Sequence, residues 1–564
     1  MKLSDYIAHV LVKEGIHTVF GYQGSSVSHL IDSICNADIK YVQNYHEQAS
    51  AFAACGYAEA THNLGVAVAC SGPGATNLIT GIANAYYDSL PCLFIVGQVS
   101  SHELKDNGSR QNGFQETKIV DIVKPITKYA VEILDPQSLA EELQKAIMIA
   151  KTGRKGPVLI SIPHNVQQAQ IENEVIWAEP TISKEPIDTS LVADLLHKSK
   201  QPLLLIGGGA FELKGNPAFQ KFTQKYKIPV VASLRGLNNV CFNDEFSGFL
   251  GVYGNRLANL AVFGSDLLIV FGSRLDSRQT GGIRDNFAPN AKIIQVDADA
   301  NEIGREFPID YTFNCTCVEF IDSVKNYFDD SKHEYREWHN KLADINKYCT
   351  SEIQSQGADP NLLVEYISNI LQKDDTLVTT DVGQNQMWVA QSIKMSDSSS
   401  FLTSGGHGTM GYSLPAAIGG YYAKPKTTIV CYMGDGGLQM NIQELETLRR
   451  EQIPAVIVVF RNSTLGLIRD YQTKALNGRL NGSVTGFSVP DLSKLAVLYD
   501  MDYLHISNND FSAIQYSALV NKRIIIDVEV SKESEILPEL AYKRAIYDQR
   551  PFVDIDKIKS ILNQ

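Results

Sequence analysis

The sequence predicts an α/β protein built from three doubly wound parallel-sheet domains. Three observations lead to this prediction: the chain length, the ordinary composition, and the alternation of short apolar runs with longer helical patterns. A chain of 564 residues is too long for one core, because a domain usually holds about 100–200 residues. With 44% hydrophobic and 20% charged residues, the composition is that of a folded globular protein and argues against disorder or a coiled coil.

Short apolar runs bounded by turn residues alternate with longer amphipathic segments throughout the chain. Such alternation is typical of βαβ units, whose parallel sheets are covered by helices on both faces. We therefore predict buried strands at 65–70, 90–97, 157–163, 202–209, 266–271, 292–297, 376–380, 428–433, 455–460 and 523–529.

Two breaks divide this series of strands. The first is the polar, proline-marked stretch 167–188, and the second is the charged, helix-like stretch 329–358. The expected domains are therefore residues 1–170, 188–328 and 359–530, followed by a C-terminal tail at 531–564.

Charge and targeting signals exclude several classes of function. The chain has 50 basic and 63 acidic residues, a net charge of −13, and no dense basic run, so we expect no nucleic-acid partner. No segment approaches the roughly 18–20 uninterrupted apolar residues of a membrane span. The first residues predict an amphipathic surface helix rather than a signal peptide, with apolar positions at Leu3, Ile7, Val10 and Leu11. We expect no membrane partner and a cytoplasmic location.

The nine cysteines are scattered along the chain. Cys315 and Cys317 form only an isolated C-x-C, without a second group of ligands at the spacing that zinc requires. Reduced thiols are the simpler interpretation.

The most specific chemical signal lies where two predicted strands end. Asp435, between Gly434 and Gly436, follows the strand 428–433, and Asn462 follows the strand 455–460. Because the carboxyl ends of parallel strands meet at one edge of a sheet, Asp435 and Asn462 are expected to lie close together. Carboxylate, amide and carbonyl oxygens form half of the octahedral shell that Mg²⁺ prefers, and a diphosphate and water can complete it. Alone, the G-D-G triplet would equally suit a tight turn.

Glu47 is the second signal, at the point where an alternating strand ends and a helix begins. An acid in the first turn of a helix usually only complements the helix dipole. Three glycine-rich turns between strand and helix favour a functional role here: GYQGSS at 21–26, SGPGATN at 71–77 and SGGHGTMG at 404–411.

Together these motifs resemble the thiamine-diphosphate enzymes, and specifically the acetohydroxyacid (acetolactate) synthase branch, which includes flavin-containing carboligases that form branched-chain deoxysugars. The resemblance covers nearly the whole chain. Its specific parts are HEQA at 46–49, SGPGATN at 71–77, GFQET at 113–117, SRLDSRQTGG at 273–282, TTDVGQNQMW at 379–388, TSGGHGTMGYSLPAAIG at 403–419 and GDGGLQMNIQELETL at 434–448. The resemblance implies a pyrimidine-binding, a central and a diphosphate-binding domain.

The resemblance also implies a reaction and a role for Glu47. This carboxylate would hydrogen-bond the aminopyrimidine ring of thiamine diphosphate and favour the tautomer that deprotonates the thiazolium carbon. The resulting nucleophile attacks the keto group of pyruvate, carbon dioxide leaves, and the two-carbon unit passes to a second carbonyl compound.

By the same resemblance, Met410 matches a bulky residue that forces the two cofactor rings together, although a methionine is also an ordinary core filler. The Mg²⁺ ligands match Asp435, Asn462 and the carbonyl of Thr464. Residues at the reacting centre match Phe114, Gln115, Lys128 and Arg278, whose guanidinium suits a carboxylate. Further thiamine-diphosphate positions are Tyr22, Gln23, Gly24, Ser25, Pro73, Asn77, Gln384, Gly408, Gly434, Gly436 and Gly437.

The middle domain resembles the FAD site of this branch. A G-G-G turn after a strand is a weak signal by itself, because it lacks the full G-x-G-x-x-G pattern. The multi-part match comprises Gly207, Gly208, Gly209, Ser233, Leu234, Gly251, Gly254, Gly272, Arg274, Asp276, Asp297 and Ala298. In the family this flavin is mostly structural, so FAD binding would not imply redox turnover.

Several positions depart from the family pattern, and they cluster around the substrate. The GYPGG turn is here Tyr22-Gln23-Gly24-Ser25, SGGLG has become SGGHG with His407, and the expected tryptophan is Tyr471. DDR has become Asp276-Ser277-Arg278, and the tail at 536–552 lacks the usual proline-glycine ending. These exchanges predict a more polar acceptor pocket, in which His407 either contacts the acceptor or is an ordinary histidine.

Two acceptors therefore stay open: a second 2-keto acid, or a nucleotide-linked keto-deoxysugar. The alternative activities are an FAD-dependent pyruvate oxidase and a simple 2-keto acid decarboxylase. A scaffold that kept only the fold would lose Glu47 or the metal ligands, and all are present. Since the family places the pyrimidine on one subunit and the diphosphate on another, we expect a homodimer or a homotetramer.

Overall fold

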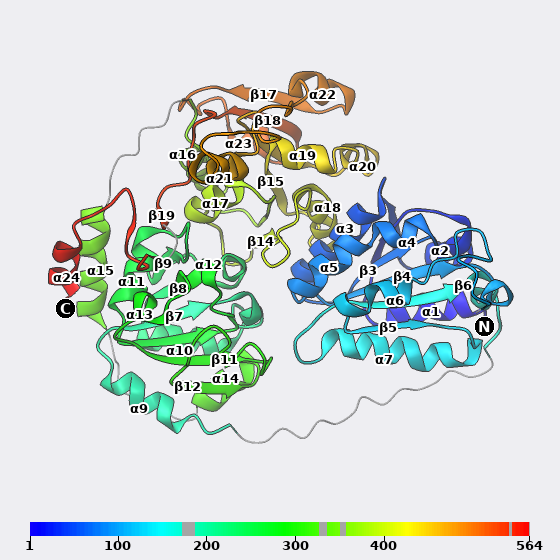
Figure 1. The fold of residues 1–564 in the computed structure, drawn as a ribbon, viewed down its shortest axis with the longest axis horizontal. Helices are drawn as coiled ribbons and strands as arrows, with labels where there is room; N and C mark the ends of the chain where they lie inside the picture. Colours follow the sequence, from blue (N-terminus) through cyan, green and yellow to red (C-terminus); the bar gives the residue numbers. More distant parts are fainter. Residues whose placement is uncertain (106, 172–186, 326–334, 350–356, 541–543, 563–564) are drawn as a thin grey trace.

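The computed structural model describes residues 1–105, 107–171, 187–325, 335–349, 357–540 and 544–562. It contains three six-stranded sheets in successive stretches of the chain, and every strand pair within them is parallel. Figure 1 shows the three domains as separate colour blocks, from blue and cyan through green to yellow and red. The predicted fold class is confirmed.

The N-terminal sheet has the strand order β2-β1-β3-β4-β6-β5. Its strands are β1 (Thr18–Gly21), β2 (Lys40–Gln43), β3 (Gly65–Ala69), β4 (Cys92–Gln98), β5 (Tyr129–Glu132) and β6 (Val158–Pro163). Its helices are α1 (Leu3–Lys13), α2 (Ser28–Asn36), α3 (Glu47–Thr61), α4 (Pro73–Asn77), α5 (Ile79–Tyr87), α6 (Ile119–Val123), α7 (Leu139–Lys151) and α8 (His164–Gln167). Helix α1 buries all four of its predicted apolar positions, which confirms the amphipathic helix.

The central sheet has the order β12-β11-β10-β7-β8-β9. Its strands are β7 (Pro202–Ile206), β8 (Val230–Ala232), β9 (Phe246–Phe249), β10 (Leu267–Phe271), β11 (Lys292–Asp297) and β12 (Tyr311–Asn314). Its helices are α9 (Ser190–Lys198), α10 (Pro217–Tyr226), α11 (Arg256–Gly264), α12 (Ser277–Thr280), α13 (Arg284–Phe287) and α14 (Cys317–Val324), together with the 3₁₀ turns η5 (Gly208–Ala210) and η6 (Arg235–Asn239).

The C-terminal sheet has the order β14-β13-β15-β16-β18-β17. Its strands are β13 (Thr376–Thr380), β14 (Ser400–Thr403), β15 (Thr428–Gly434), β16 (Ala455–Arg461), β17 (Asp502–Ile506) and β18 (Arg523–Glu529). Its helices are α16 (Pro360–Ile370), α17 (Gln384–Ser392), α18 (Ser413–Ala423), α19 (Asp435–Met440), α20 (Glu444–Arg450), α21 (Gly466–Ala475), α22 (Leu492–Leu498) and α23 (Tyr516–Leu519).

The connections and the tail contain little regular structure of their own. Much of the first predicted break lies outside the described residues, and the described part of the second forms α15 (Arg336–Cys349). The tail forms a small hairpin of β19 (Glu539–Leu540) and β20 (Gln549–Arg550) and ends in α24 (Ile555–Leu562). Leu540 N donates to Val252 O at 2.7 Å, so the tail rests on the central domain. Across the described ranges, no helix has the length and apolar character needed to cross a bilayer.

Helices α3 and α18 join the N-terminal and C-terminal domains by a contact of backbone against backbone. A β-carbon at Gly419 would stand 1.9 Å from the Ala53 carbonyl oxygen, and one at Gly56 would stand 2.2 Å from the Ala416 carbonyl oxygen. No real β-carbon fits at such distances, so only glycine permits this approach. Because α3 begins at Glu47, the contact also fixes where that acid lies.

We predict that Gly419→Ala lowers stability by about 1–3 kcal/mol or more, because the added methyl group must push the two helices apart. Denaturant unfolding of the purified variant measures the change. Gly215→Ala is the matched control, since a β-carbon at Gly215 meets no atom within 4 Å. Equal stability of the two variants would contradict the close approach of α3 and α18.

Candidate active site

An oxygen-rich edge forms where β15 and β16 end, as the sequence predicts. Asp435 begins α19, directly after β15, and its carboxylate accepts hydrogen bonds from the backbone N–H groups of Ser463, at 2.6 Å, and Gly436, at 2.8 Å. Ser463 follows Asn462 at the end of β16, so the two strand ends meet. Burial raises the pKa of Asp435 to about 6, with the two N–H donors opposing that rise.

Asn462, Thr464 and Gln384 complete this edge. Asn462 Nδ2 donates to Gln384 Oε1 at 3.2 Å, and Asn462 Oδ1 accepts from Thr464 N at 3.0 Å. The hydroxyl oxygen of Thr464 is buried and has no hydrogen-bond partner. An orphaned hydroxyl beside a carboxylate and an amide is what an absent polar ligand would leave, so the residues fit a Mg²⁺–diphosphate group.

Glu47 is the first residue of α3 and is 9% exposed. Its Oε2 accepts a hydrogen bond from Asn77 Nδ2 at 2.9 Å, which brings the predicted SGPGATN turn to the carboxylate. The neighbouring Gly74 leaves room for it, because a β-carbon there would stand 3.2 Å from Glu47 Oε1. His46 caps the helix by accepting from Gln48 N at 3.1 Å.

The turns at 22–25 and 70–73 lie against each other at the carboxyl ends of β1 and β3. A β-carbon at Gly24 would stand 2.6 Å from Cys70 Cβ, and one at Gly72 would stand 2.8 Å from Gln115 Cβ. The structure therefore brings Gln115 to the glycine turns. Phe114, beside it, is 86% exposed. Other exposed members of the predicted set are Tyr22, Gln23, Ser25 and Pro73.

The loop after β14 carries Met410 to the oxygen-rich edge. A β-carbon at Gly436 would lie 3.5 Å from Met410 Cε, so the methionine covers the Gly434–Gly437 turn. The buried carboxylate of Asp381 holds the end of this loop in place by accepting hydrogen bonds from Gly411 N at 2.9 Å and Ser413 N at 3.3 Å. Sequence reasoning did not single out Asp381.

His407 is exposed in the same loop, next to Gly408, whose φ of +69° suits glycine. The His407 ring stacks on Tyr87, with ring centroids 5.4 Å apart and planes 9° apart. Both residues of this stack are exposed to solvent.

Three further predicted residues lie apart from this group of contacts. Lys128 Nζ donates to the carbonyls of Ile149 and Thr152 at the end of α7, and burial lowers its pKa to about 8. Arg278 is exposed on α12, and Tyr471 is 64% exposed on α21. Their assigned roles at the reacting centre stay predictions.

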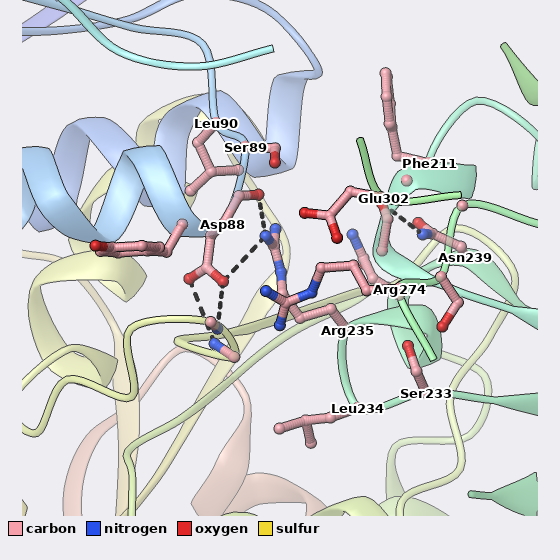
Figure 2. Close-up of a pocket in the computed structure, with 18 of the residues that line it drawn as sticks. Asp88, Ser89, Leu90, Phe211, Ser233, Leu234, Arg235, Asn239, Arg274 and Glu302 are labelled. Atoms are coloured by element: carbon pink, nitrogen blue, oxygen red, sulfur yellow. Dashed lines mark hydrogen bonds and ion pairs between the residues drawn. The ribbon is translucent and has the colours of Figure 1, made fainter. Parts of the chain in front are cut away.

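A cavity of about 560 Å³ opens between the three domains (Figure 2). Of the residues predicted for FAD, those that line it are Gly208, Gly209, Ser233, Leu234, Gly272, Arg274, Asp276, Asp297 and Ala298. Gly207, Gly251 and Gly254 shape the adjoining turns without lining it. Gly209 N donates to Gly272 O at 2.9 Å, which joins two of the turns that line the cavity.

The cavity also contains a buried ionic cluster that sequence reasoning missed. Arg235, from η6, lies between Glu59 of α3 and Asp88 at the end of α5. Its Nε is buried without a hydrogen-bond partner. An unpaired donor at the wall of a polar cavity fits a ligand rich in acceptor atoms, such as FAD. No sequence signal marks the cluster, since its members come from three separate segments without a motif.

Comparison with known proteins identifies the family. Three family models match the chain: "Thiamine pyrophosphate enzyme, N-terminal TPP binding domain" over residues 1–122, the central domain over 189–324 and the C-terminal TPP binding domain over 381–528. The chain therefore belongs to the thiamine pyrophosphate (thiamine diphosphate) enzymes.

Curated relatives narrow this family to its acetolactate synthase-like branch. The chain is 34% identical to the probable acetolactate synthase large subunit of Methanocaldococcus jannaschii, covering 95% of this chain and 93% of that protein. It is 34% identical to the acetolactate synthase isozyme 2 large subunit of Escherichia coli, covering 90% and 92%. The Haemophilus influenzae acetolactate synthase large subunit is 33% identical, covering 95% of each chain. The protein is a thiamine-diphosphate-dependent enzyme of this type.

We predict that Gln384→Leu weakens the Mg²⁺ affinity of the coenzyme-bound protein by about 10–100-fold, the usual effect of losing a residue that orients a metal ligand. Gln384 orients the Asn462 amide by accepting from its Nδ2, so that Asn462 Oδ1, which accepts from Thr464 N, keeps a second lone pair for a metal. Mg²⁺ titration in the presence of thiamine diphosphate, followed by tryptophan fluorescence, measures the change.

Gln391→Leu, on the same helix, is the matched control. Gln384 donates to the carbonyl of Ser534 at 2.8 Å, and Gln391 donates likewise to that of Tyr253 at 2.8 Å but is not hydrogen-bonded to Asn462. An equal loss of Mg²⁺ affinity in both variants would contradict the role of Gln384.

Proposed function

We propose that this protein uses Mg²⁺ and thiamine diphosphate to decarboxylate pyruvate and transfer the two-carbon unit to a carbonyl acceptor. The observation that carries the proposal is the buried oxygen set of Asp435 and Asn462, with the orphaned Thr464 hydroxyl beside it and Met410 over the adjacent glycine turn. The acetolactate synthases among its relatives support transfer to an acceptor over a pyruvate oxidase or a simple decarboxylase.

We assign metal binding, proton movement and support of the coenzyme to different residues of the chain. Asp435, Asn462 and the Thr464 carbonyl would hold Mg²⁺, and the glycine turn would let the diphosphate approach the start of α19. Bound thiamine diphosphate supplies the nucleophilic carbon and the electron sink. Glu47, oriented by Asn77, would hydrogen-bond the aminopyrimidine and move a proton at its ring nitrogen. Met410 would support the thiazolium side of the coenzyme.

FAD in the central cavity is part of this proposal. The support is the number of predicted flavin positions that line one cavity and the unpaired Nε of Arg235 at its wall. We assign the flavin a structural role, in keeping with the resemblance.

Two acceptors fit the proposal, a second 2-keto acid and a nucleotide-linked keto-deoxysugar. The synthase relatives favour the first. The stack of His407 on Tyr87 favours the second, because both rings are exposed and offer polar edges to a large hydroxylated acceptor. Arg278 suits the carboxylate of a keto acid or the phosphate of a nucleotide.

We further propose a homodimer or homotetramer. The family places the two ends of the coenzyme on different subunits, and an exposed Phe114 beside Gln115 is the kind of apolar side chain that a neighbouring subunit covers.

We predict that Glu47→Gln lowers pyruvate decarboxylation by about 10²–10⁴-fold, because an amide cannot take up the proton that this step moves. Carbon dioxide release is the measurement, and Mg²⁺-dependent coenzyme binding should persist. Glu141→Gln is the matched control, since Glu141 also lies in the first turn of a helix and only complements its dipole. Full turnover by Glu47→Gln would remove this residue from its assigned role.

We predict that the protein loaded with Mg²⁺, thiamine diphosphate and FAD joins the two-carbon unit of pyruvate to a nucleotide-linked keto-deoxysugar. Mass spectrometry of incubations with this sugar or with 2-ketobutyrate identifies the products, and an oxygen electrode tests the oxidase alternative. His407→Leu should lower kcat/KM for the sugar about tenfold relative to the keto acid, the size of one lost hydrogen bond to a polar substrate.

His339→Leu, on α15, is the control for this substitution. Products formed only from keto acids, with the sugar recovered unchanged, would reject the sugar acceptor while leaving the carboligase intact.

A further inference from the structure

One arginine, whose side chain is 16% exposed, links the three domains at the cavity. Arg235 projects from the central domain, and its guanidinium pairs with Glu59 Oε1 at 2.7 Å and Asp88 Oδ1 at 3.3 Å. It also donates to the carbonyl oxygen of Asp88. The side chains of Glu59 and Asp88 are 6% and 1% exposed, so these ion pairs are shielded from water.

Asp88 has a second set of partners, in the C-terminal domain. Its carboxylate accepts hydrogen bonds from Gly406 N at 2.7 Å and Gly405 N at 3.3 Å. Figure 2 shows the Asp88 carboxylate directed toward the Arg235 guanidinium. Asp88 thus links a cation of one domain to the backbone of another.

The two glycines are required for this contact. A β-carbon at Gly406 would stand 2.7 Å from the Tyr87 carbonyl oxygen, and one at Gly405 would stand 2.6 Å from Arg235 Cγ. The loop therefore lies flat on the end of α5 and on the arginine. Nearby, Asn84 Oδ1 accepts from Ser404 Oγ at 2.6 Å, so α5 holds the loop at a second point.

Burying the charges of this cluster costs free energy unless each charge has enough partners. Burial opposes the charge on Arg235, but the Glu59 and Asp88 carboxylates outweigh it and raise the pKa of the guanidinium. Burial raises the pKa of Glu59, with Arg235 opposing. Two acids share one cation, so the N–H groups of Gly405 and Gly406 supply the rest of the stabilisation that Asp88 needs. The Asp88 carboxylate therefore depends on the loop N–H groups for stabilisation, and the loop depends on the carboxylate for its position.

We propose that Asp88, held by Arg235, is a positioning residue that fixes the loop 404–409, and through it the places of His407 and Met410. The inference rests on the function proposed above for those two residues. Loss of the Asp88 carboxylate would release the loop, displace Met410 from the glycine turn and move His407 out of its stack. Glu59 pairs with the same arginine, and its other oxygen accepts from the Tyr412 hydroxyl at 3.4 Å, beyond the loop, so Glu59 serves stability without holding residues 404–409.

Asp88→Asn and Glu59→Gln form a matched pair that separates positioning from stability. Each replaces one carboxylate partner of Arg235 by an amide of the same shape, and only the first touches the loop. Hydrogen exchange read by mass spectrometry on peptides spanning 404–411 should speed up at least tenfold in Asp88→Asn and less than twofold in Glu59→Gln. Thiamine-diphosphate affinity, measured by fluorescence without substrate, should fall at least tenfold only in Asp88→Asn.

Equal exchange in the two variants, or unchanged coenzyme affinity in Asp88→Asn, would overturn the proposal. Because the exchange measurement needs no coenzyme, a wild-type protein that fails to bind thiamine diphosphate would refute the proposed function separately. If Asp88→Asn does not fold, Arg235→Lys replaces it in the exchange measurement, since a lysine keeps the charge but cannot bridge both acids. Its loop should exchange at least threefold faster than that of Glu59→Gln, and an equal rate would again overturn the proposal.

Discussion

The close contact of α3 with α18 is the constraint on which the rest of the site depends. Gly56 and Gly419 let the two backbones meet where any side chain would force them apart. Since α3 begins at Glu47 and α18 follows the Met410 loop, this one contact fixes how the N-terminal and C-terminal domains of a subunit lie against each other, and with them the places of Glu47 and of the glycine turns on the subunit surface. A rigid scaffold of this kind is what a catalytic acid needs.

The domain junctions use two different kinds of interaction. Backbone packing joins α3 to α18, whereas charge joins the central domain to the other two through Arg235, Asp88 and Glu59. Apolar packing tolerates small displacements poorly and gives rigidity, while a buried ion pair gives geometric specificity at a cost in desolvation. The polar junction lies beside the exposed loop of His407, where a defined orientation matters more than stability.

The chain's own periodicity predicted the strands that form continuous apolar runs and missed several short or exposed ones. Strands such as β15 and β16 are buried on both faces and form continuous apolar runs, which a single sequence reveals. Strands β12 and β17 are short and largely exposed edge strands, and their mixed composition resembles that of loops. The meeting of Asp435 with the end of β16 followed from strand topology alone. The Asp88–Arg235 pair did not, because its members lie 147 positions apart and neither belongs to a motif.

Two groups of proposed site residues differ in where they lie in the fold, and this explains which of them a sequence can predict. The residues proposed to hold the coenzyme stand at strand ends, where the fold itself fixes them, so the sequence predicts that they meet. The residues proposed to meet the acceptor, such as His407 and Tyr471, stand on exposed segments that the fold constrains less. An exchange on such a segment can alter the acceptor without altering the scaffold, so membership in the synthase branch constrains the first half of the reaction more than the second.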